Sequence, residues 1–224
     1  MENFNGIVSL FLVCIEVVLL INLLIFTEKN KVNNLIITIV VLLFSYQFME
    51  FFMCYTESYS SQLVYGSFVI ISFLPPLVLY LVITIREATS NFYKLIFLPA
   101  ITLLVYYLFV VDGFVITSCT LLFASYEMPL GDLYGIVYYA PIIIATYLLY
   151  KMIKEPKYET KKVNLIIMLS GILLTFIPVA LIIITFPVLL DYVESFFCKA
   201  ASLIAITLTI YAMRNKNIIE DNNE

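Results

Sequence analysis

The sequence predicts an all-α integral membrane protein, a bundle of seven transmembrane helices in a single domain over residues 1–224. Its 224 residues are 63% hydrophobic and only 12% charged, with a mean hydropathy of +1.04. A water-soluble domain of this length could not bury so much apolar surface. The apolar residues gather in seven long runs, and nearly all of the basic residues lie in alternate connections between them. These observations indicate membrane helices with a fixed direction across the bilayer.

Each apolar run is long enough for a helix that crosses the hydrocarbon core, which takes about 20 residues. Strands of a membrane barrel would be shorter and would alternate in polarity. The first run lacks a basic start and a cleavage signature of small residues, so we expect it to be a retained span and not a signal peptide. The predicted spans are residues 6–26, 34–54, 64–85, 94–111, 133–151, 163–185 and 190–213.

The basic residues predict the direction of these spans. Eleven of the twelve Lys and Arg residues lie in the first, third and fifth connections and in the C-terminal tail, whereas the other connections carry only acidic charges. By the positive-inside rule the N-terminus is outside and the C-terminus is cytoplasmic. The fifth connection, residues 151–162, holds five lysines. We expect it to face a cytoplasmic or membrane signalling partner; no nucleic acid is expected, and the oligomeric state stays open.

Prolines inside the predicted spans are expected to kink them, because each proline removes one backbone N–H and frees a carbonyl one turn back. The alternative is that they only reflect the higher proline content of membrane helices. The residues are Pro75, Pro76, Pro99, Pro141 and Pro178.

Two of the four cysteines face the side predicted to be outside. Cys54 ends the second span and Cys119 lies in the long loop before the fifth. Disulfides persist in oxidising compartments, so we expect these two cysteines to pair. The β-branched and aromatic residues around Cys119 also predict a small hairpin over the end of the bundle.

Four ionisable residues fall within the predicted spans: Glu16, Glu50, Glu194 and Lys199. Counted at about 1.5 Å per residue from the outer ends, Glu16 and Lys199 share a depth near the middle of the bilayer. Glu50 and Glu194 lie about two turns above them. An isolated charge at the helix centre costs about 2.5–3.5 kcal/mol. Opposite charges offset that cost only if they meet.

If the helices are arranged in sequence order, the first, second and seventh are neighbours, so these groups can share one site. Gln47 precedes Glu50 by three residues and Ser202 follows Lys199 by three, so both lie on the same helix faces as the charges. Two interpretations stay open. The cluster is either a static clamp that fixes helix packing or a pocket for a ligand or a proton.

The composition argues against several chemistries. The chain has no histidine, which removes the commonest metal ligand and the usual general base, and no metal site is expected. No nucleophile–base pair is recognisable, so an enzyme is the least supported class. A retinal Schiff base on Lys199, with Glu16 or Glu50 as counterion, is a third possibility. The absence of Trp and of a carboxylate in the third span argues against retinal, and no other cofactor is expected.

Several segments resemble the seven-span N-terminal sensor region of some prokaryotic histidine kinases. The similar stretches are "VVLLFSYQFMEFFMC" with Glu50, "YGSFVIISFLPPLVLYLVITI" with Pro75 and Pro76, "KKVNLIIMLSGILLTFIPVAL" with Gly171 and Pro178, and the exit "LIAITLTIYAMRNKNIIE". "SYQFMEFF" and "SFFCKAAS" are also similar to an uncharacterised family of small seven-span prokaryotic membrane proteins. The resemblance implies a prokaryotic plasma membrane. It also implies an output through a partner protein, since no kinase follows the last span.

The sequence therefore favours a receptor-like or sensory protein of the lipid bilayer. It would bind a small or lipidic ligand, or respond to protons, between the first, second and seventh spans. The alternative is a small transporter or proton-coupled carrier that uses Glu16, Glu50 and Lys199.

Overall fold

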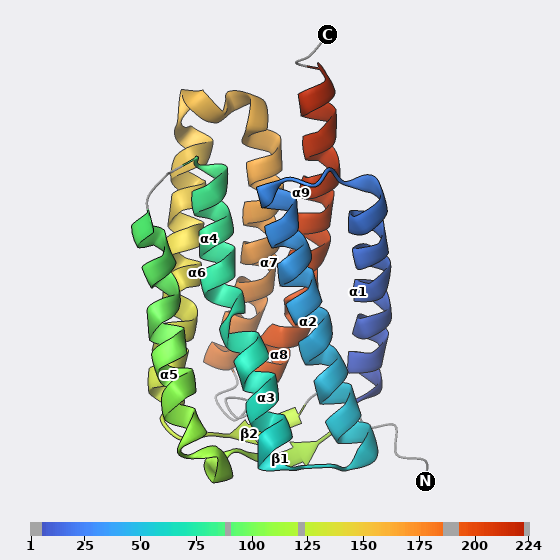
Figure 1. The fold of residues 1–224 in the computed structure, drawn as a ribbon, viewed down its shortest axis with the longest axis vertical. Coiled ribbons are helices and arrows are strands. Elements are labelled where there is room, and N and C mark those ends of the chain that lie inside the picture. The colour runs from blue at the N-terminus through green and yellow to red at the C-terminus, as the bar shows by residue number, and fades with distance from the viewer. Residues whose placement is uncertain (1–5, 88–90, 121–123, 186–192, 222–224) are drawn as a thin grey trace.

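The computed structural model describes residues 6–87, 91–120, 124–185 and 193–221. These residues form a bundle of long helices with a two-stranded sheet across one end (Figure 1). The helices are α1 (Ile7–Phe26), α2 (Lys31–Thr56), α3 (Ser61–Ser72), α4 (Leu74–Ile85), α5 (Leu98–Leu108), α6 (Gly131–Lys154), α7 (Lys162–Thr185), α8 (Val193–Ala200) and α9 (Ser202–Asp221). Shorter elements are the 3-10 helices η1 (Asn91–Phe97), η2 (Val111–Gly113) and η3 (Pro156–Lys161) and the strands β1 (Val115–Cys119) and β2 (Ala124–Glu127).

Among the residues that the structure describes, six helical segments are long and apolar enough to cross a membrane, and they indicate an integral membrane protein. They are Ile7–Phe26, Lys31–Thr56, Ser61–Ile85, Gly131–Lys154, Pro156–Leu181 and Phe196–Asn215. The segment predicted as the fourth span is shorter, a continuous apolar helix over Tyr93–Leu108. Large apolar side chains such as Phe11, Ile143 and Leu181 lie exposed on the outside of the bundle. An exposed apolar surface of this kind suits contact with lipid.

The helices are less regular than the predicted spans. The third span is interrupted at Phe73, and Pro75 and Pro76 lie in the first turn of α4. Pro99 likewise lies in the first turn of α5. Proline is tolerated there because the N–H groups of a first turn have no partner within the helix. Pro141 and Pro178 lie inside continuous helices, α6 and α7. The kink expected from Pro75 and Pro76 is therefore present as the interruption at Phe73, whereas α6 and α7 continue through Pro141 and Pro178.

The last predicted span consists of two helices. The regular helix is interrupted at Ala201, so that α8 turns away from the axis of α9 (Figure 1). The break follows directly after Lys199 and Ala200. Discontinuous helices at membrane depth occur where the irregular backbone is buried in protein or lines a cavity.

The core is formed where α2 and α9 run through the middle of the bundle. Ile36, Val40 and Met53 of α2 and Ala205 and Ala212 of α9 are fully buried. α7 approaches α9 closely at Gly171, where a Cβ atom would lie 2.9 Å from Cβ of Thr207. Small residues allow such close approach between membrane helices. Gly171 therefore fixes the distance between α7 and α9.

The loop before α6 forms the predicted hairpin. β1 and β2 pair antiparallel, with a register shift between Ile116 and Ser118. Cys119 at the end of β1 forms a disulfide with Cys54 near the end of α2, and their Cα atoms are 5.6 Å apart. The backbone N–H of Gly6 donates to the carbonyl of Thr120 at 3.0 Å. The hairpin is therefore joined to the beginning of α1 and the end of α2, across what we call the hairpin end of the bundle.

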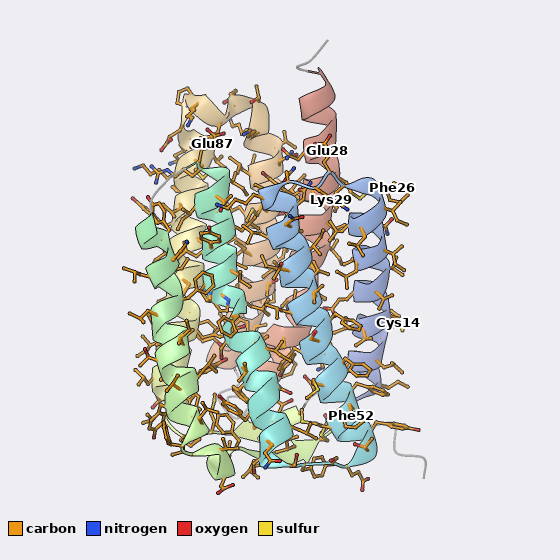
Figure 2. All side chains as sticks on the ribbon, viewed as in Figure 1. Cys14, Phe26, Glu28, Lys29, Phe52 and Glu87 are labelled. Carbon is orange, nitrogen blue, oxygen red and sulfur yellow. A yellow bond between two sulfur atoms is a disulfide. The ribbon has the colours of Figure 1, made fainter. Side chains whose placement is uncertain are left out.

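Charges are sorted between the two ends. Figure 2 shows Glu28, Lys29 and Glu87 at the end opposite the hairpin, which we call the basic end. Glu87 forms salt bridges there with Lys157 and Lys161, at 3.6 and 3.5 Å. Within the described residues, every Lys and Arg except Lys199 belongs to a connection or helix terminus at the basic end. This uneven distribution of basic residues is the feature from which the sequence predicts the direction of the helices across the bilayer.

Replacing Gly171 with Ala is expected to destabilise the protein by about 1–3 kcal/mol, because the new methyl group overlaps Thr207 on a packed neighbouring helix. The matched control is Gly66→Ala, since a Cβ atom there would meet only Cε of Met49 at 4.0 Å. The control should leave stability unchanged or raise it by up to about 1 kcal/mol. Thermal unfolding of the three proteins in one detergent measures both effects. Equal melting temperatures for both variants would contradict the close α7–α9 contact.

Replacing Cys54 and Cys119 together with Ser should lower stability by up to about 4 kcal/mol, the loop-closure value for their sequence separation of 65. The exposed Cys14 provides the control, and Cys14→Ser should have no effect. Peptide mapping under non-reducing conditions checks the bond directly. Recovery of Cys54 and Cys119 as two unpaired thiols would refute it.

Candidate functional site

A buried salt bridge joins the last turn of α8 to α2. The ammonium of Lys199 contacts Oε1 of Glu50; the Glu50 side chain is 1% exposed and that of Lys199 is 14% exposed. Ser9 of α1 completes the group. Its hydroxyl accepts a hydrogen bond from Lys199 Nζ at 3.1 Å and donates one to Glu50 Oε1 at 3.1 Å. Side chains of three helices therefore meet at one charge pair.

The opposite directions of α8 and α2 favour the contact between Lys199 and Glu50. Side chains tilt toward the N-terminus of their own helix. α8 begins at the hairpin end, so the Lys199 side chain is directed toward that end, while α2 runs the opposite way and directs Glu50 inward. The two side chains converge. Counting depth at about 1.5 Å per residue places Lys199 level with Glu16, but it assumes one continuous helix along the bundle axis, and the helix is interrupted at Ala201.

The backbone at the α8–α9 junction accepts hydrogen bonds from three surrounding side chains. Gln47 Nε2 of α2 donates to the carbonyl of Cys198 at 2.8 Å. The Ser202 hydroxyl donates to the carbonyl of Lys199 at 2.8 Å, and the Thr175 hydroxyl of α7 reaches the carbonyl of Ala200 at 3.1 Å. Polar backbone groups need such partners where water is scarce. The helix interruption is therefore stabilised by α2, α7 and α9 together.

The structure brings together four of the six residues expected in the polar cluster: Gln47, Glu50, Lys199 and Ser202. Glu16 is fully buried on α1, two turns beyond Ser9, and neither of its carboxyl oxygens has a hydrogen-bond partner among the described residues. The side chain of Glu194 lies outside the described residues.

Sequence reasoning missed two members of the polar cluster, Ser9 and Thr175. Ser9 precedes Glu16 by seven residues, a spacing that places both on one face of α1. That spacing could have placed Ser9 in the cluster. No comparable signal marks Thr175 in the sequence, because a threonine within an apolar helix commonly bonds to its own backbone one turn back. Thr175 does so as well, to the carbonyl of Gly171 at 2.9 Å.

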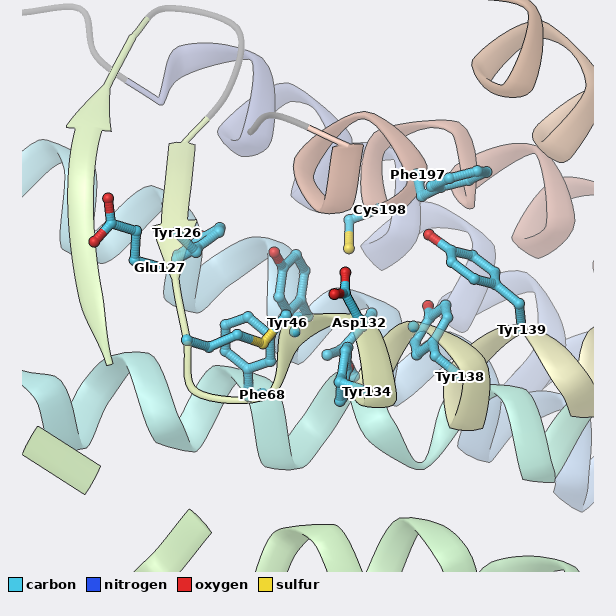
Figure 3. A pocket seen from close by; sticks show the side chains of 14 residues that line it. Tyr46, Phe68, Tyr126, Glu127, Asp132, Tyr134, Tyr138, Tyr139, Phe197 and Cys198 are labelled. Carbon is cyan, nitrogen blue, oxygen red and sulfur yellow. The ribbon is translucent and has the colours of Figure 1, made fainter. Parts of the chain in front are cut away.

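A pocket of about 560 Å³ lies beside this cluster, between α2, α3, α6, α8 and strand β2 (Figure 3). The sequence prediction put a pocket between the first, second and seventh spans. The pocket instead touches that region at its edge, through Tyr46 and Cys198. Tyr46 precedes Gln47 and Cys198 precedes Lys199 in sequence, and the side chains of Tyr46 and Cys198 are hydrogen-bonded to each other. The pocket wall is thus adjacent to the salt bridge.

Half of the fourteen residues that line the pocket are aromatic. Six of these rings form a continuous row from the hairpin to α8, with neighbouring centroids 5.2–5.6 Å apart. In order along the row they are Tyr126, Phe68, Tyr134, Tyr138, Tyr139 and Phe197. Such a wall is rigid, because each ring is held by its neighbours. It offers a large apolar contact surface with hydroxyl groups at its edges.

The charged groups of the pocket are both acidic. Glu127 ends β2 and Asp132 lies in the first turn of α6, and both are exposed. Figure 3 shows the Asp132 carboxyl group among Tyr46, Tyr138 and Cys198. No described lining residue is Lys or Arg. A search of the described residues for three or more His, Cys, Asp or Glu side chains that could hold a metal ion found no such group.

Replacing Lys199 with Met should destabilise the protein by about 3–5 kcal/mol, because it leaves the Glu50 carboxylate buried without its cation. Adding Glu50→Gln should recover most of that loss, since removal of both charges of a buried pair is often nearly neutral. Glu16→Gln is the matched control: an equally buried glutamate with no hydrogen-bond partner among the described residues, expected to shift stability by less than about 1 kcal/mol. Unfolding in one detergent compares the four proteins.

A Glu16→Gln variant as unstable as Lys199→Met would show that Glu16 is the true partner of Lys199. Lys162→Met is a second control. Its exposed salt bridge with Glu159, at 3.1 Å, should contribute little because water screens it.

Comparison with known proteins adds no family to this geometry. No protein-family model matches the chain, and no curated protein or solved structure matches it. Any assignment of function therefore has to come from the residues of the site.

Proposed function

We propose that this protein is a receptor-like membrane protein that binds a small ligand in the aromatic pocket and responds at the α8–α9 junction. The observation that carries the proposal is the shared boundary of pocket and cluster. Cys198 lines the pocket, and its own carbonyl accepts the hydrogen bond from Gln47. A ligand that moves Cys198 or Tyr46 would therefore act on the backbone beside Lys199.

The proposed topology has seven spans, with Tyr93–Leu108 as a short fourth span and the hairpin end outside the cell. The sorting of charges supports this direction by the positive-inside rule. The disulfide at the hairpin end agrees with it, since disulfides persist in oxidising compartments. In this topology the pocket is accessible from outside and the lysine-rich segment 151–162 faces the cytoplasm.

The signalling part of the proposal continues from the resemblance to kinase sensor regions. α9 runs from the junction beside Lys199 to the basic end, where Arg214 Nε donates to Oδ1 of Asn164 in α7 at 3.1 Å. A change of angle at Ala201 would move this contact relative to segment 151–162. A partner protein at the basic end could detect that movement as a population shift between two arrangements.

A transporter is the second candidate, favoured by the interrupted α8–α9 helix with an ion pair at its break. Many transporters place their substrate site at discontinuous helices. The two candidates differ in outcome: a receptor binds its ligand without moving it across the membrane, and a carrier moves it. Lys199 does not line the pocket, so the pocket offers no support for retinal attached to that residue.

The test is a binding screen in nanodiscs, with a fragment library that contains equal numbers of cationic, neutral and anionic compounds. Gly135→Trp should fill the pocket, because Gly135 lines it and a Cβ there has space, with Cε2 of Tyr139 at 3.9 Å. Compounds that bind the pocket should lose about tenfold or more in affinity in this variant. Ala140 is exposed on the same helix and does not line the pocket, so Ala140→Trp should bind these compounds with unchanged affinity.

Bound compounds should also slow amide hydrogen exchange at residues 198–205 and show no flux in proteoliposomes. Flux that depends on Glu50 would favour the transporter. A library with no compound sensitive to Gly135→Trp would contradict ligand binding in this pocket.

A further inference from the structure

We infer that the aromatic pocket selects organic ammonium ions, meaning small molecules with a positively charged nitrogen on an aromatic or aliphatic body. This inference rests on the proposed function, because it names the ligand class of the same pocket. It follows from three independent features of the site: the row of rings, the sign of the charges at its mouth and the distribution of charge over the whole chain.

The row of rings supplies the first feature. The face of an aromatic ring is electron-rich and attracts a cation that lies over it. Tyr138, Tyr139 and Phe197 form consecutive contacts at 5.2 and 5.3 Å, with interplanar angles of 82° and 54°. Rings turned at such angles present faces in several directions around one cavity. This is the arrangement by which aromatic cages surround an alkylated ammonium group.

The acidic residues supply the second feature. Asp132 lines the pocket from the first turn of α6 and is exposed, and Figure 3 draws its carboxyl group beside Tyr46 and Cys198. Glu127 lies farther out, at the end of β2. An anionic ligand would meet two carboxylates and no basic lining residue among those described, whereas a cation would meet two favourable charges. The pocket thus discriminates by repulsion as well as by attraction.

The charge distribution supplies the third feature. Lys199 is the basic residue nearest to the pocket in the described chain, and its charge is already compensated by Glu50. The remaining basic residues lie at the far end of the bundle. Glu57 and Asp112 add further negative charge to the hairpin end. A surface of one sign raises the local concentration of oppositely charged ligands and speeds their association.

The dimensions of the pocket fit a small molecule. Its volume of about 560 Å³ lies within the usual range for small-molecule sites. The ammonium group can come from a soluble amine or from the headgroup of a membrane lipid. Both sources share the same chemistry, and the experiment below separates them.

The test measures binding of three probes of one shape to the full chain in nanodiscs: benzyltrimethylammonium, its neutral isostere neopentylbenzene and the anion phenylmethanesulfonate. Empty nanodiscs provide the baseline, and only binding that Gly135→Trp abolishes is counted. The cation should bind about tenfold more tightly than the neutral probe, and the anion should not bind. Replacing Asp132 with Asn and Glu127 with Gln together should lower the affinity for the cation by about tenfold and leave the affinity for the neutral probe unchanged.

Asp112→Asn is the matched control, because Asp112 carries the same charge at the same end of the bundle without lining the pocket. It should change the affinity for the cation by less than about twofold. Nanodiscs of a neutral galactolipid, which has no ammonium group, and of phosphatidylcholine distinguish the two sources without a difference in membrane charge. If the pocket takes lipid headgroups, phosphatidylcholine should compete with the soluble cation and lower its affinity in those nanodiscs only. If the pocket takes only soluble amines, the affinity for the cation should be equal in both lipids.

Equal affinity for the cation and the neutral probe would overturn the inference while leaving ligand binding by the pocket intact. The inference also fails if the double variant binds the cation as wild type does, or if no probe shows binding that Gly135→Trp abolishes. In the last case the library screen, which includes neutral and anionic compounds, decides separately whether the pocket binds any ligand.

Discussion

The salt bridge between Lys199 and Glu50 is the constraint on which the rest of the bundle depends. A charge in the apolar interior is tolerated only when it is paired, so α2 and α8 must remain in contact. Ser9 adds α1 to the same contact. Next to this pair the helix is interrupted, and side chains from α2, α7 and α9 donate hydrogen bonds to the backbone carbonyls of Cys198, Ala200 and Lys199. Five helices, α1, α2, α7, α8 and α9, are therefore held together at one level of the structure.

The aromatic pocket is a consequence of the same arrangement. Because α8 turns away from α9, Phe197 and Cys198 face α6 and the hairpin rather than lipid, and they close one side of the cavity. The disulfide between Cys54 and Cys119 holds the hairpin over the opposite side. Cys198 lines the pocket, its neighbour Lys199 forms the charge pair, and the helix break follows at Ala201. This continuity is the physical reason to expect that occupation of the pocket affects the junction.

Much of the architecture could be predicted from local sequence. The hydrophobic runs indicated membrane helices because their length is set by the bilayer, and the hairpin followed from the β-branched and aromatic residues around Cys119. The pairing of Cys54 with Cys119 followed from their position on one side of the membrane. The interruption at Phe73 followed from Pro75 and Pro76, because a proline has no N–H to donate to the preceding turn. The interruption at Ala201 did not follow, because no proline or glycine lies beside it. Proline alone is also no sufficient signal, since α6 and α7 continue through Pro141 and Pro178.

The sequence by itself determined that the chain lies in a membrane, that its charges are sorted between two ends and that a few polar residues are buried together. Those properties depend on composition and on the periodicity of single helices. Only the tertiary structure decided that Lys199 pairs with Glu50 while Glu16 has no hydrogen-bond partner among the described residues. It also decided that the aromatic residues of α3, α6, α8 and β2 surround one cavity. Both outcomes depend on the tilt of side chains and the angles between helices, which are set by packing among segments far apart in the chain.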